Sequence, residues 1–190
     1  MSVSEGAARP LPREQARRLR LLALDVDGVL TDGRIIYGND GEELKAFNIR
    51  DGLGIKALQL SGIRVALITG RRSAIVERRA RELGIEHVVQ GREDKLVALR
   101  ELCASLGVEL ADCAYMGDDL PDLAAVEAAG LGLTVADGCR AVCRAADWCS
   151  TLPGGAGAVR EACDALLEAR DELAALEARY SAGRAASGAS

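Results

Sequence analysis

The fold is decided by the stretch LLALDVDG, which occupies residues 21–28. Its first four residues are apolar, and the run stops at Asp25. A short apolar run of this kind predicts a buried strand that ends in a polar loop. Asp25 and Asp27 are two residues apart, so an extended backbone carries both carboxylates on the same side. The first strand is therefore expected to deliver two carboxylates to its carboxyl end.

Beyond this strand, helical and extended patterns alternate along the chain. Helices are expected over residues 52–60, 75–83, 95–106 and 123–129, and strands over residues 65–68, 87–89, 113–116 and 131–135. A long last helix is expected over residues 158–179. The alternation predicts an α/β fold, a Rossmann-like parallel sheet with helices on both faces.

A small β-hairpin flap is expected at residues 33–47. The turn Asn39-Asp40-Gly41 separates two strand-like stretches, residues 34–37 and 42–47, and an Asn/Asp-Gly turn in this setting is typical of a hairpin. The length of 190 residues suits one domain, which we place at residues 19–180. A loose arm over residues 1–18 and a disordered tail over residues 181–190 are expected to flank it.

Composition excludes several classes of protein. The net charge is −5 and no basic stripe is present, so binding to nucleic acid is not expected. No apolar run approaches the ~18 residues of a membrane span, and the N-terminus lacks the apolar region of a signal peptide. We therefore expect a cytoplasmic protein without a membrane segment.

Histidine and cysteine content restricts the chemistry further. His87 is the only histidine, which excludes a multi-histidine metal site. Six cysteines lie within residues 103–163 and are expected to be small buried side chains. Cys139, Cys143 and Cys149 leave a metal role open, although their spacing is not that of a zinc site.

Polar residues also follow two later strands. They are Thr69, Gly70 and Arg71 after one strand, and Gly117, Asp118, Asp119 and Asp122 after the other. Ligands of open parallel sheets bind at the carboxyl ends of strands, so these residues are expected to join Asp25 and Asp27. Such a cluster of carboxylates suits Mg²⁺. Taken singly, the same residues also fit plain turns and a helix N-cap.

Lys95 opens a predicted helix between these two strand ends. A cation in the first turn of a helix opposes the helix dipole, and a bound phosphate would reverse the sign of that effect. Thr69-Gly70 offers a hydroxyl and an unobstructed backbone N–H, a small anion-binding nest. The alternatives are a solvated surface lysine and an ordinary strand-to-helix turn.

Together these residues resemble the motifs of the haloacid dehalogenase superfamily of phosphotransferases. Residues 25–31, DVDGVLT, match its first motif, and Thr69, Lys95 and residues 117–122 match the second, third and fourth. Only the hairpin stands where other members insert a cap domain, so the chain resembles the capless branch. The resemblance covers residues 20–165.

Within that branch the chain is similar to phosphatases of 3-deoxy-D-manno-octulosonate 8-phosphate, a lipopolysaccharide precursor. The matching stretches are residues 47–52, 68–71 and 154–161. The resemblance implies hydrolysis of this sugar-acid phosphate through an aspartyl-phosphate. The alternatives are a nonulosonate 9-phosphate of the sialic type as substrate, an inactive scaffold or activator of the same fold, and a domain of a fused enzyme. Arg71 favours the octulosonate, since the sialic-type relatives carry an acidic residue there.

The resemblance also implies roles for the carboxylates. Asp25 would be the nucleophile, and Asp27 would protonate the departing sugar oxygen and then accept a proton from water. Mg²⁺ would be held by Asp25, by the main-chain oxygen of Asp27 and by Asp118. Asp119 and Asp122 would orient water and support these ligands.

The remaining roles concern the substrate. Thr69, Gly70 and Lys95 would hold the phosphoryl oxygens. Arg71 stands beside the nest and could bind the sugar-acid carboxylate, and Arg79 is a weaker candidate, two helical turns further on. The family is tetrameric. An uncapped site exposes the substrate to water, so a homo-oligomer, a tetramer formed through the apolar hairpin, is expected to close it.

Overall fold

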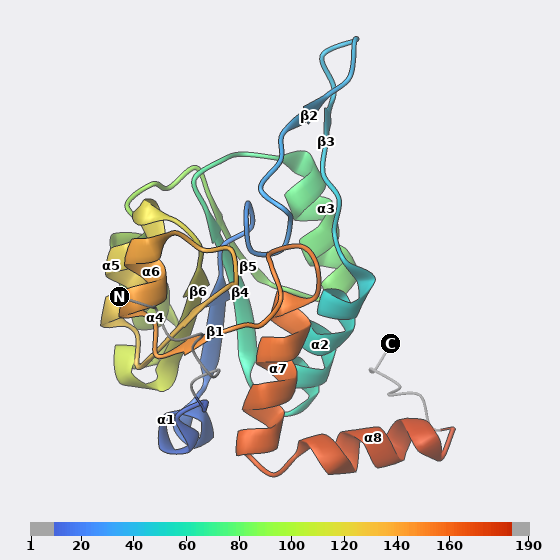
Figure 1. Ribbon diagram of the computed structural model, residues 1–190, viewed down its shortest axis with the longest axis vertical. Helices are drawn as coiled ribbons and strands as arrows, with labels where there is room; N and C mark the ends of the chain where they lie inside the picture. Colours follow the sequence, from blue (N-terminus) through green and yellow to red (C-terminus); the bar gives the residue numbers. More distant parts are fainter. Residues whose placement is uncertain (1–9, 184–190) are drawn as a thin grey trace, which may run out of the picture.

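The computed structural model describes residues 10–183, and its main sheet has six parallel strands (Figure 1). The strands are β1 (Leu21–Leu24), β4 (Arg64–Thr69), β5 (His87–Gln90), β6 (Cys113–Gly117), β7 (Leu131–Thr134) and β8 (Trp148–Cys149). Their order is β5-β4-β1-β6-β7-β8, which places β1 at the centre of the sheet. The predicted α/β, Rossmann-like fold is confirmed.

Helices cover both faces of this sheet. One face carries α2 (Ile49–Leu60), α3 (Ala74–Leu83) and α7 (Ala158–Ala169), and the other carries α4 (Lys95–Leu106), α5 (Leu123–Ala128) and α6 (Arg140–Ala145). The short 3-10 helices η1 (Leu110–Asp112) and η2 (Leu120–Asp122) flank β6. Within residues 10–183, none of the helices is long and apolar enough to cross a membrane.

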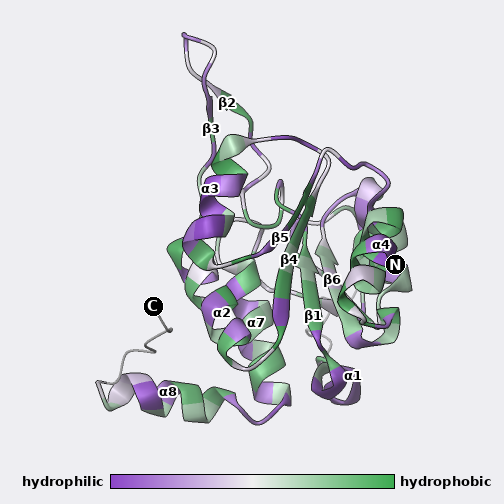
Figure 2. Cartoon of the chain, turned by 180° about the vertical axis from the view of Figure 1, so that it is seen from behind, coloured by the Kyte–Doolittle hydropathy of each residue, from purple (hydrophilic) through white to green (hydrophobic). Residues whose placement is uncertain are grey.

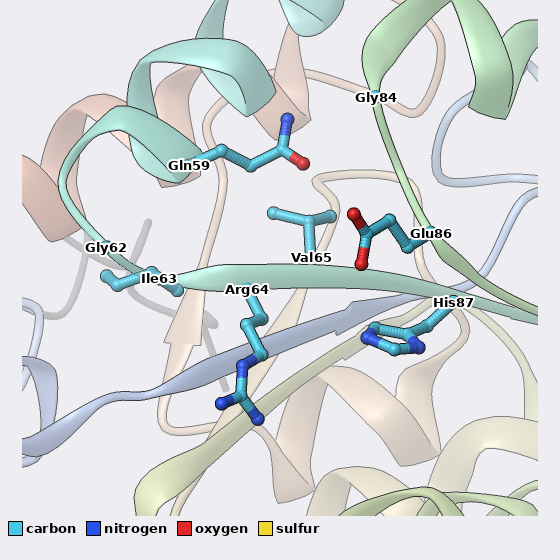
Figure 3. A pocket seen from close by; sticks show the side chains of 8 residues that line it. All are labelled: Gln59, Gly62, Ile63, Arg64, Val65, Gly84, Glu86 and His87. Carbon is cyan, nitrogen blue, oxygen red and sulfur yellow. The ribbon is translucent and has the colours of Figure 1, made fainter. Parts of the chain in front are cut away.

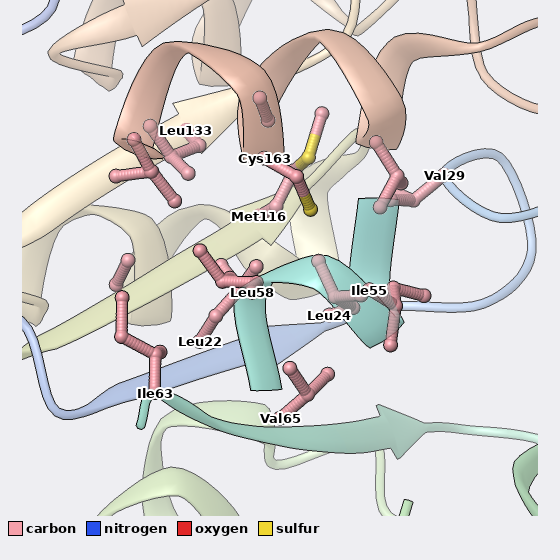
Figure 4. Close-up of a cluster of buried hydrophobic side chains, with 14 of the residues drawn as sticks. Leu22, Leu24, Val29, Ile55, Leu58, Ile63, Val65, Met116, Leu133 and Cys163 are labelled. Carbon is pink, nitrogen blue, oxygen red and sulfur yellow. The ribbon is translucent and has the colours of Figure 1, made fainter. Parts of the chain in front are cut away.

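The residues of β1 alternate between two cores. Leu22 and Leu24 pack toward α2 and α7, where Ile55 and Leu58 meet them (Figure 4). Leu21 and its neighbour Ala23 face the core under α4 and α5. Each leucine buried in this way stabilises the fold by about 1.5–3 kcal/mol. Because both faces are covered, the strand is apolar at every position, as the hydropathy colouring of Figure 2 shows for the centre of the sheet.

The expected hairpin is present but shorter, and it projects from the body of the molecule (Figure 1). It consists of β2 (Ile36–Tyr37) and β3 (Glu43–Leu44), which pair antiparallel. Ile36, Tyr37 and Leu44 of the hairpin are exposed to solvent. Phe47, at the base of the hairpin, instead packs against the core of its own chain.

The prediction of one long last helix over residues 158–179 is wrong. The helix breaks into α7 and α8 (Leu173–Ser181), because Asp171 adopts a left-handed conformation with φ +61°. The Asp171 carboxylate accepts hydrogen bonds from Arg13 at 2.8 Å and from Arg17 at 2.6 Å. Aspartate tolerates this conformation better than most residues, which makes the break possible at this position.

The expected loose arm over residues 1–18 also differs from the structure in its second part. From residue 13 the chain forms α1 (Arg13–Arg18), whose Ala16 is buried in the core. Residues 1–9, and residues 184–190 of the expected tail, lie outside the described part of the chain. The helix α6 and the strand β8 were not predicted from the sequence, and the two residues of β8 are too few to show a period.

Candidate active site

Three neighbouring strands end at one edge of the sheet and carry the predicted site residues. Asp25 follows β1, and its backbone N–H donates to the carbonyl of Met116 in β6 at 2.9 Å. Thr69 ends β4, and Asp118 directly follows β6. Because β4 and β6 flank β1, these side chains meet where open α/β sheets bind their ligands.

A cluster of carboxylates at this edge fits a divalent cation. Asp25, Asp118 and Asp122 each offer an oxygen, and these oxygens lie within 4.8 Å of one another. Asp118 Oδ1 is buried and has no hydrogen-bond partner among the described residues. A buried carboxylate oxygen without a donor needs a positive charge, and hard oxygen ligands without histidine suit Mg²⁺.

Burial raises the pKa of two of these carboxyl groups. Loss of solvation, followed by the nearby charge of Asp122, raises the pKa of Asp25 from 3.8 to about 7. The same two causes, in the same order, raise the pKa of Asp118 from 3.8 to about 7. A cation bound between Asp25 and Asp118 would lower both pKa values and favour the ionised carboxylates.

These pKa values predict how Mg²⁺ stabilises the fold at different pH. Between pH values of about 4 and 7, the metal-free folded protein binds more protons than the unfolded chain, so its stability falls as pH rises. Mg²⁺ must displace those protons. Thermal unfolding should therefore show a larger upward shift of Tm on adding Mg²⁺ at about pH 8 than at about pH 5.5. An equal shift at both values would contradict the assignment of these carboxyls as ligands.

Lys95 lies inside the carboxylate cluster. Its ammonium nitrogen is 2.7 Å from Asp25 Oδ2 and 2.7 Å from Asp122 Oδ1, and its side chain is 6% exposed. Burial works against the charge of Lys95, but Asp25 and Asp122 outweigh it and raise the pKa of the ammonium group. The lysine is therefore a fixed positive charge at the strand ends, and the alternative of a solvated surface lysine is excluded.

Asp122 serves as the support of this arrangement. Its Oδ1 accepts hydrogen bonds from Lys95 and from the Tyr115 hydroxyl, each at 2.7 Å. Its Oδ2 accepts from the backbone N–H groups of Asp118 at 3.1 Å and Asp119 at 3.2 Å. Both oxygens are thus engaged, and they fix the backbone that presents the Asp118 carboxylate.

The loop after β1 is packed tightly against Asp118 and against the segment that contains Gly154. A Cβ atom on Gly28 would lie 2.1 Å from Asp118 Oδ2, so only glycine lets this loop approach the carboxylate. A Cβ atom on Gly154 would lie 1.8 Å from the carbonyl oxygen of Gly28. The segment that contains Gly154 therefore supports the loop that carries Asp25 and Asp27.

We expect Gly154→Ala to lower the free energy of unfolding by at least ~2 kcal/mol, because the added methyl group has no space. Gly62→Ala is the control: Gly62 has φ +86° with no atom near its missing Cβ, so it incurs only the backbone strain of about 1–2 kcal/mol. Denaturant unfolding of both variants measures the difference. A Gly154→Ala protein more stable than Gly62→Ala would contradict the close packing.

The residues predicted to form a phosphate nest lie at the end of β4. Thr69 is buried, and its hydroxyl oxygen accepts a hydrogen bond from the backbone N–H of Arg71 at 3.3 Å. Gly70 separates the two and leaves its own backbone unobstructed, with only Glu93 Cγ near its missing Cβ at 3.6 Å. The Arg71 side chain is 41% exposed and bonds Glu43 Oε2 of the hairpin at 3.0 Å.

The structure does not bring Arg79 into the carboxylate cluster. Its guanidinium lies over the Phe47 ring, 5.8 Å from the ring centre, and donates to the Asn48 carbonyl at 3.4 Å. It also pairs with Glu82 on its own helix at 3.4 Å. Arg79 thus connects α3 to the base of the hairpin, a structural role that its position in the sequence did not indicate.

The sequence analysis did not predict three residues of the site, Glu43, Lys45 and Tyr115. Lys45 pairs with Asp27 and lies 3.2 Å from Glu43 Oε1, so the hairpin reaches into the site. The only available signal was two charged residues at alternate positions in an apolar hairpin. Tyr115 had a clearer signal, because a tyrosine in a buried strand needs a partner for its hydroxyl.

A separate cavity of about 240 Å³ lies at the opposite edge of the sheet (Figure 3). Its lining includes Arg64, the first residue of β4, and His87, the first residue of β5. The only histidine of the chain is therefore remote from the carboxylates. It takes no part in their chemistry.

Comparisons with known proteins agree with this site. Residues 48–130 match the haloacid dehalogenase-like hydrolase family. The chain is 51% identical over 160 residues to the 3-deoxy-D-manno-octulosonate 8-phosphate phosphatase KdsC of Yersinia pestis, covering 84% of this chain and 86% of that protein. A solved structure of the same phosphatase from Moraxella catarrhalis contains magnesium, phosphate and a KDO molecule. It is 52% identical with a TM-score of 0.87, covering 88% of this chain and 97% of that one.

A third similar protein carries a different metal. It is the cobalt-bound deoxy-D-mannose-octulosonate 8-phosphate phosphatase of Haemophilus influenzae, which is 40% identical with a TM-score of 0.83. The match covers 86% of this chain and 95% of that one. Divalent cations thus accompany this fold in two of its relatives.

Proposed function

The chain belongs to the haloacid dehalogenase-like hydrolases and, among them, to the 3-deoxy-D-manno-octulosonate 8-phosphate phosphatases, and on this premise we propose how its residues carry out the reaction. It is a phosphoric monoester hydrolase that converts 3-deoxy-D-manno-octulosonate 8-phosphate into 3-deoxy-D-manno-octulosonate and phosphate. Mg²⁺ is its cofactor. The reaction belongs to the synthesis of a lipopolysaccharide precursor.

The observation that carries the mechanism is the contact of Asp25 with Lys95 beside the Asp118 carboxylate. Asp25 attacks phosphorus, the bond between phosphorus and the sugar oxygen breaks, and an aspartyl-phosphate forms. Lys95 offsets negative charge on the phosphoryl oxygens. Asp25, Asp118 and the main-chain oxygen of Asp27 would hold Mg²⁺, which supplies the positive charge that lets a carboxylate approach a phosphate.

Asp27 moves the protons of both steps. In the first step its carboxyl group gives a proton to the departing sugar oxygen. In the second step the Asp27 carboxylate accepts a proton from the water that attacks the aspartyl-phosphate of Asp25. Phosphate is released, the Asp25 carboxylate is restored, and Asp27 regains its protonated carboxyl group. Asp119 orients that water, and Asp122 fixes the backbone that presents the Asp118 carboxylate.

The remaining groups hold the substrate. The Thr69 hydroxyl and the Gly70 backbone N–H bind phosphoryl oxygens together with Lys95. Arg71 binds the sugar-acid carboxylate with two parallel hydrogen bonds, for which its planar side chain is suited. Its present partner, Glu43, is a carboxylate of the same kind, and the substrate takes its place.

Assays of phosphate release from a panel of sugar-acid phosphates test this function. With Mg²⁺ present, kcat/KM for the octulosonate 8-phosphate should exceed that for a sialic-type nonulosonate 9-phosphate by at least ~10-fold, the scale expected from one altered contact. A preference for the 9-phosphate would identify the nonulosonate 9-phosphate as the substrate instead. Inactivity toward every member of the panel would indicate an inactive scaffold of the same fold.

We also propose that the protein is a homo-oligomer, a tetramer, assembled through the hairpin. Ile36, Tyr37 and Leu44 are 45%, 67% and 52% exposed, a larger apolar surface than a monomer usually tolerates on one short flap. The hairpin stands beside a site that has no cap domain. A neighbouring subunit placed there would enclose the substrate and exclude water.

Ile36→Glu should dissociate this assembly, because the interface would bury an unpaired charge. KM should rise more for the sugar phosphate than for a small aryl phosphate, which needs no enclosing wall. Leu60→Glu is the control, since Leu60 is 46% exposed against 45% for Ile36 but lies on α2. Light scattering and kinetics on both substrates measure the effects. A wild-type monomer with full activity on the sugar phosphate would overturn the proposal.

Finally, we propose that residues 19–180 act as one phosphatase domain and that the protein is cytoplasmic. The six cysteines are free thiols, three of them buried. Unpaired thiols suit a reducing compartment.

A further inference from the structure

Lys45 is a buried cation that the mechanism above does not use. Its side chain is 1% exposed, although it comes from a hairpin whose other residues are largely open to solvent. Its ammonium group pairs with Asp27 Oδ1 and lies 3.2 Å from Glu43 Oε1. A lysine is buried in this way only when it is paired, so these two carboxylates are the reason for its position.

The contacts of Lys45 belong to a line of alternating charges. Asp27 contacts Lys45, Lys45 contacts Glu43, and Glu43 contacts Arg71 at 3.0 Å. The line begins at the residue that serves the sugar oxygen and ends at the residue that binds the sugar acid. The hairpin therefore contributes to the interior of its own chain's site, and Lys45 is the hairpin residue that contacts Asp27.

The backbone that follows Lys45 is held firmly. Phe47, two residues on, packs against the hydrophobic core and under Arg79. Asn48 caps α2, where its side chain accepts the backbone N–H of Arg50 at 2.9 Å. The ammonium group is thus fixed to the rigid base of the hairpin and not to its exposed tip.

Asp27, in contrast, has few restraints of its own. Among residues 10–183, Lys45 is the hydrogen-bond partner of its carboxylate, whereas Asp25 and Asp122 are held by Lys95. Proton transfer requires the carboxyl group within hydrogen-bond reach of the sugar oxygen, and a freely rotating side chain meets that condition only part of the time.

We propose that Lys45 is a positioning residue that holds the Asp27 carboxyl group in line for proton transfer to the leaving sugar oxygen and from water. The inference rests on the proposed function of Asp27. It predicts that loss of Lys45 impairs the reaction in proportion to how much the leaving group needs a proton. Alkyl oxygens, such as the sugar's, need one, and acidic phenols do not.

The test compares Lys45→Met with wild type in the presence of Mg²⁺. For the octulosonate 8-phosphate, kcat should fall by about 10²-fold with KM changed far less, the scale of lost acid–base catalysis. With an aryl phosphate of an acidic phenol, one equivalent of phenol per site should still appear in a fast phase. Slow turnover should follow, since the attack of water also needs Asp27. Across aryl phosphates of increasingly basic phenols, the fast phase should slow more steeply than in wild type.

Lys45→Arg keeps the cation and should recover most of kcat, and it replaces the methionine variant if that protein does not fold. Lys56→Met, an exposed lysine on α2, is the control and should behave as wild type. Equal losses on acidic and basic leaving groups, or normal kcat in Lys45→Met, would overturn the role of Lys45. A wild type without activity on the octulosonate phosphate would refute the proposed function separately, because the aryl series tests Lys45 without that substrate.

Discussion

Asp25→Asn is expected to lower kcat for the octulosonate 8-phosphate at least ~10³-fold, because the amide keeps the shape of the side chain but cannot attack phosphorus. The fold should survive the change. Asp25 carries a pKa raised to about 7 by burial and by Asp122, so the folded protein gains nothing from its charge near neutral pH. Steady-state kinetics and thermal unfolding of the same preparation measure both expectations.

Asp112→Asn is the matched control for this variant. Asp112 lies in η1 at the start of β6, at the opposite edge of the sheet from Asp25, and its carboxylate pairs with Arg18 at 3.0 Å. Loss of that surface pair costs at most about 1 kcal/mol and should leave kcat unchanged. An Asp25→Asn enzyme within ~10-fold of the Asp112→Asn enzyme would rule out Asp25 as the nucleophile.

Removal of the metal, or of its main ligand, is expected to have an effect of similar size. Chelation with EDTA should abolish turnover and Mg²⁺ should restore it, since the metal offsets the repulsion between carboxylate and phosphate. Asp118→Asn should lower kcat at least ~10²-fold and raise the Mg²⁺ concentration needed for half-maximal activity. The buried Oδ1 of Asp118, without a hydrogen-bond partner in the described chain, is the basis of this expectation.

Activity at several Mg²⁺ concentrations, with wild type and Asp112→Asn as references, measures this prediction. Asparagine fits the same space beside Gly28, so a folding defect is not expected to obscure the result. Turnover that survives thorough chelation would contradict metal dependence. An Asp118→Asn enzyme with wild-type Mg²⁺ dependence would move the ligand role to another carboxylate of the cluster.

The fold and the centre of the site could be predicted from sequence because each rests on a local pattern. The strand at residues 21–24 is apolar and ends at a carboxylate, and the parallel strands on either side end in polar residues in the same way. Parallel strands bring their carboxyl ends to one edge, so the pattern alone places Asp25, Thr69 and Asp118 together.

What could not be predicted depends on contacts between segments far apart in the sequence. Lys45 and Asp27 are separated by 18 residues and a hairpin, and nothing in either segment indicates that the first folds back onto the second. Arg79 was a weaker candidate for binding the substrate, and its contacts with Phe47 and the Asn48 carbonyl could not be predicted from its position in the sequence. Residue type and spacing do not report which of several arginines finds which partner.

The break in the last helix has the same origin. The apolar pattern of residues 158–179 resumes after Asp171, yet Asp171 adopts a left-handed conformation in which its carboxylate contacts Arg13 and Arg17. Those arginines belong to a segment that composition alone suggests is unstructured. Tertiary contacts of this kind override local helix preference.

The central claim, that Asp25 carries the phosphoryl group from the sugar to water, is tested most directly by rapid acid quench of a single turnover. Enzyme, Mg²⁺ and octulosonate 8-phosphate are mixed and quenched at short times, and the peptide that contains residues 21–34 is examined by mass spectrometry. A transient gain of one phosphoryl group on Asp25, which rises before free phosphate appears and is absent in Asp25→Asn, is the predicted result. Free phosphate that appears at full rate without any phosphorylated Asp25 peptide would contradict the account.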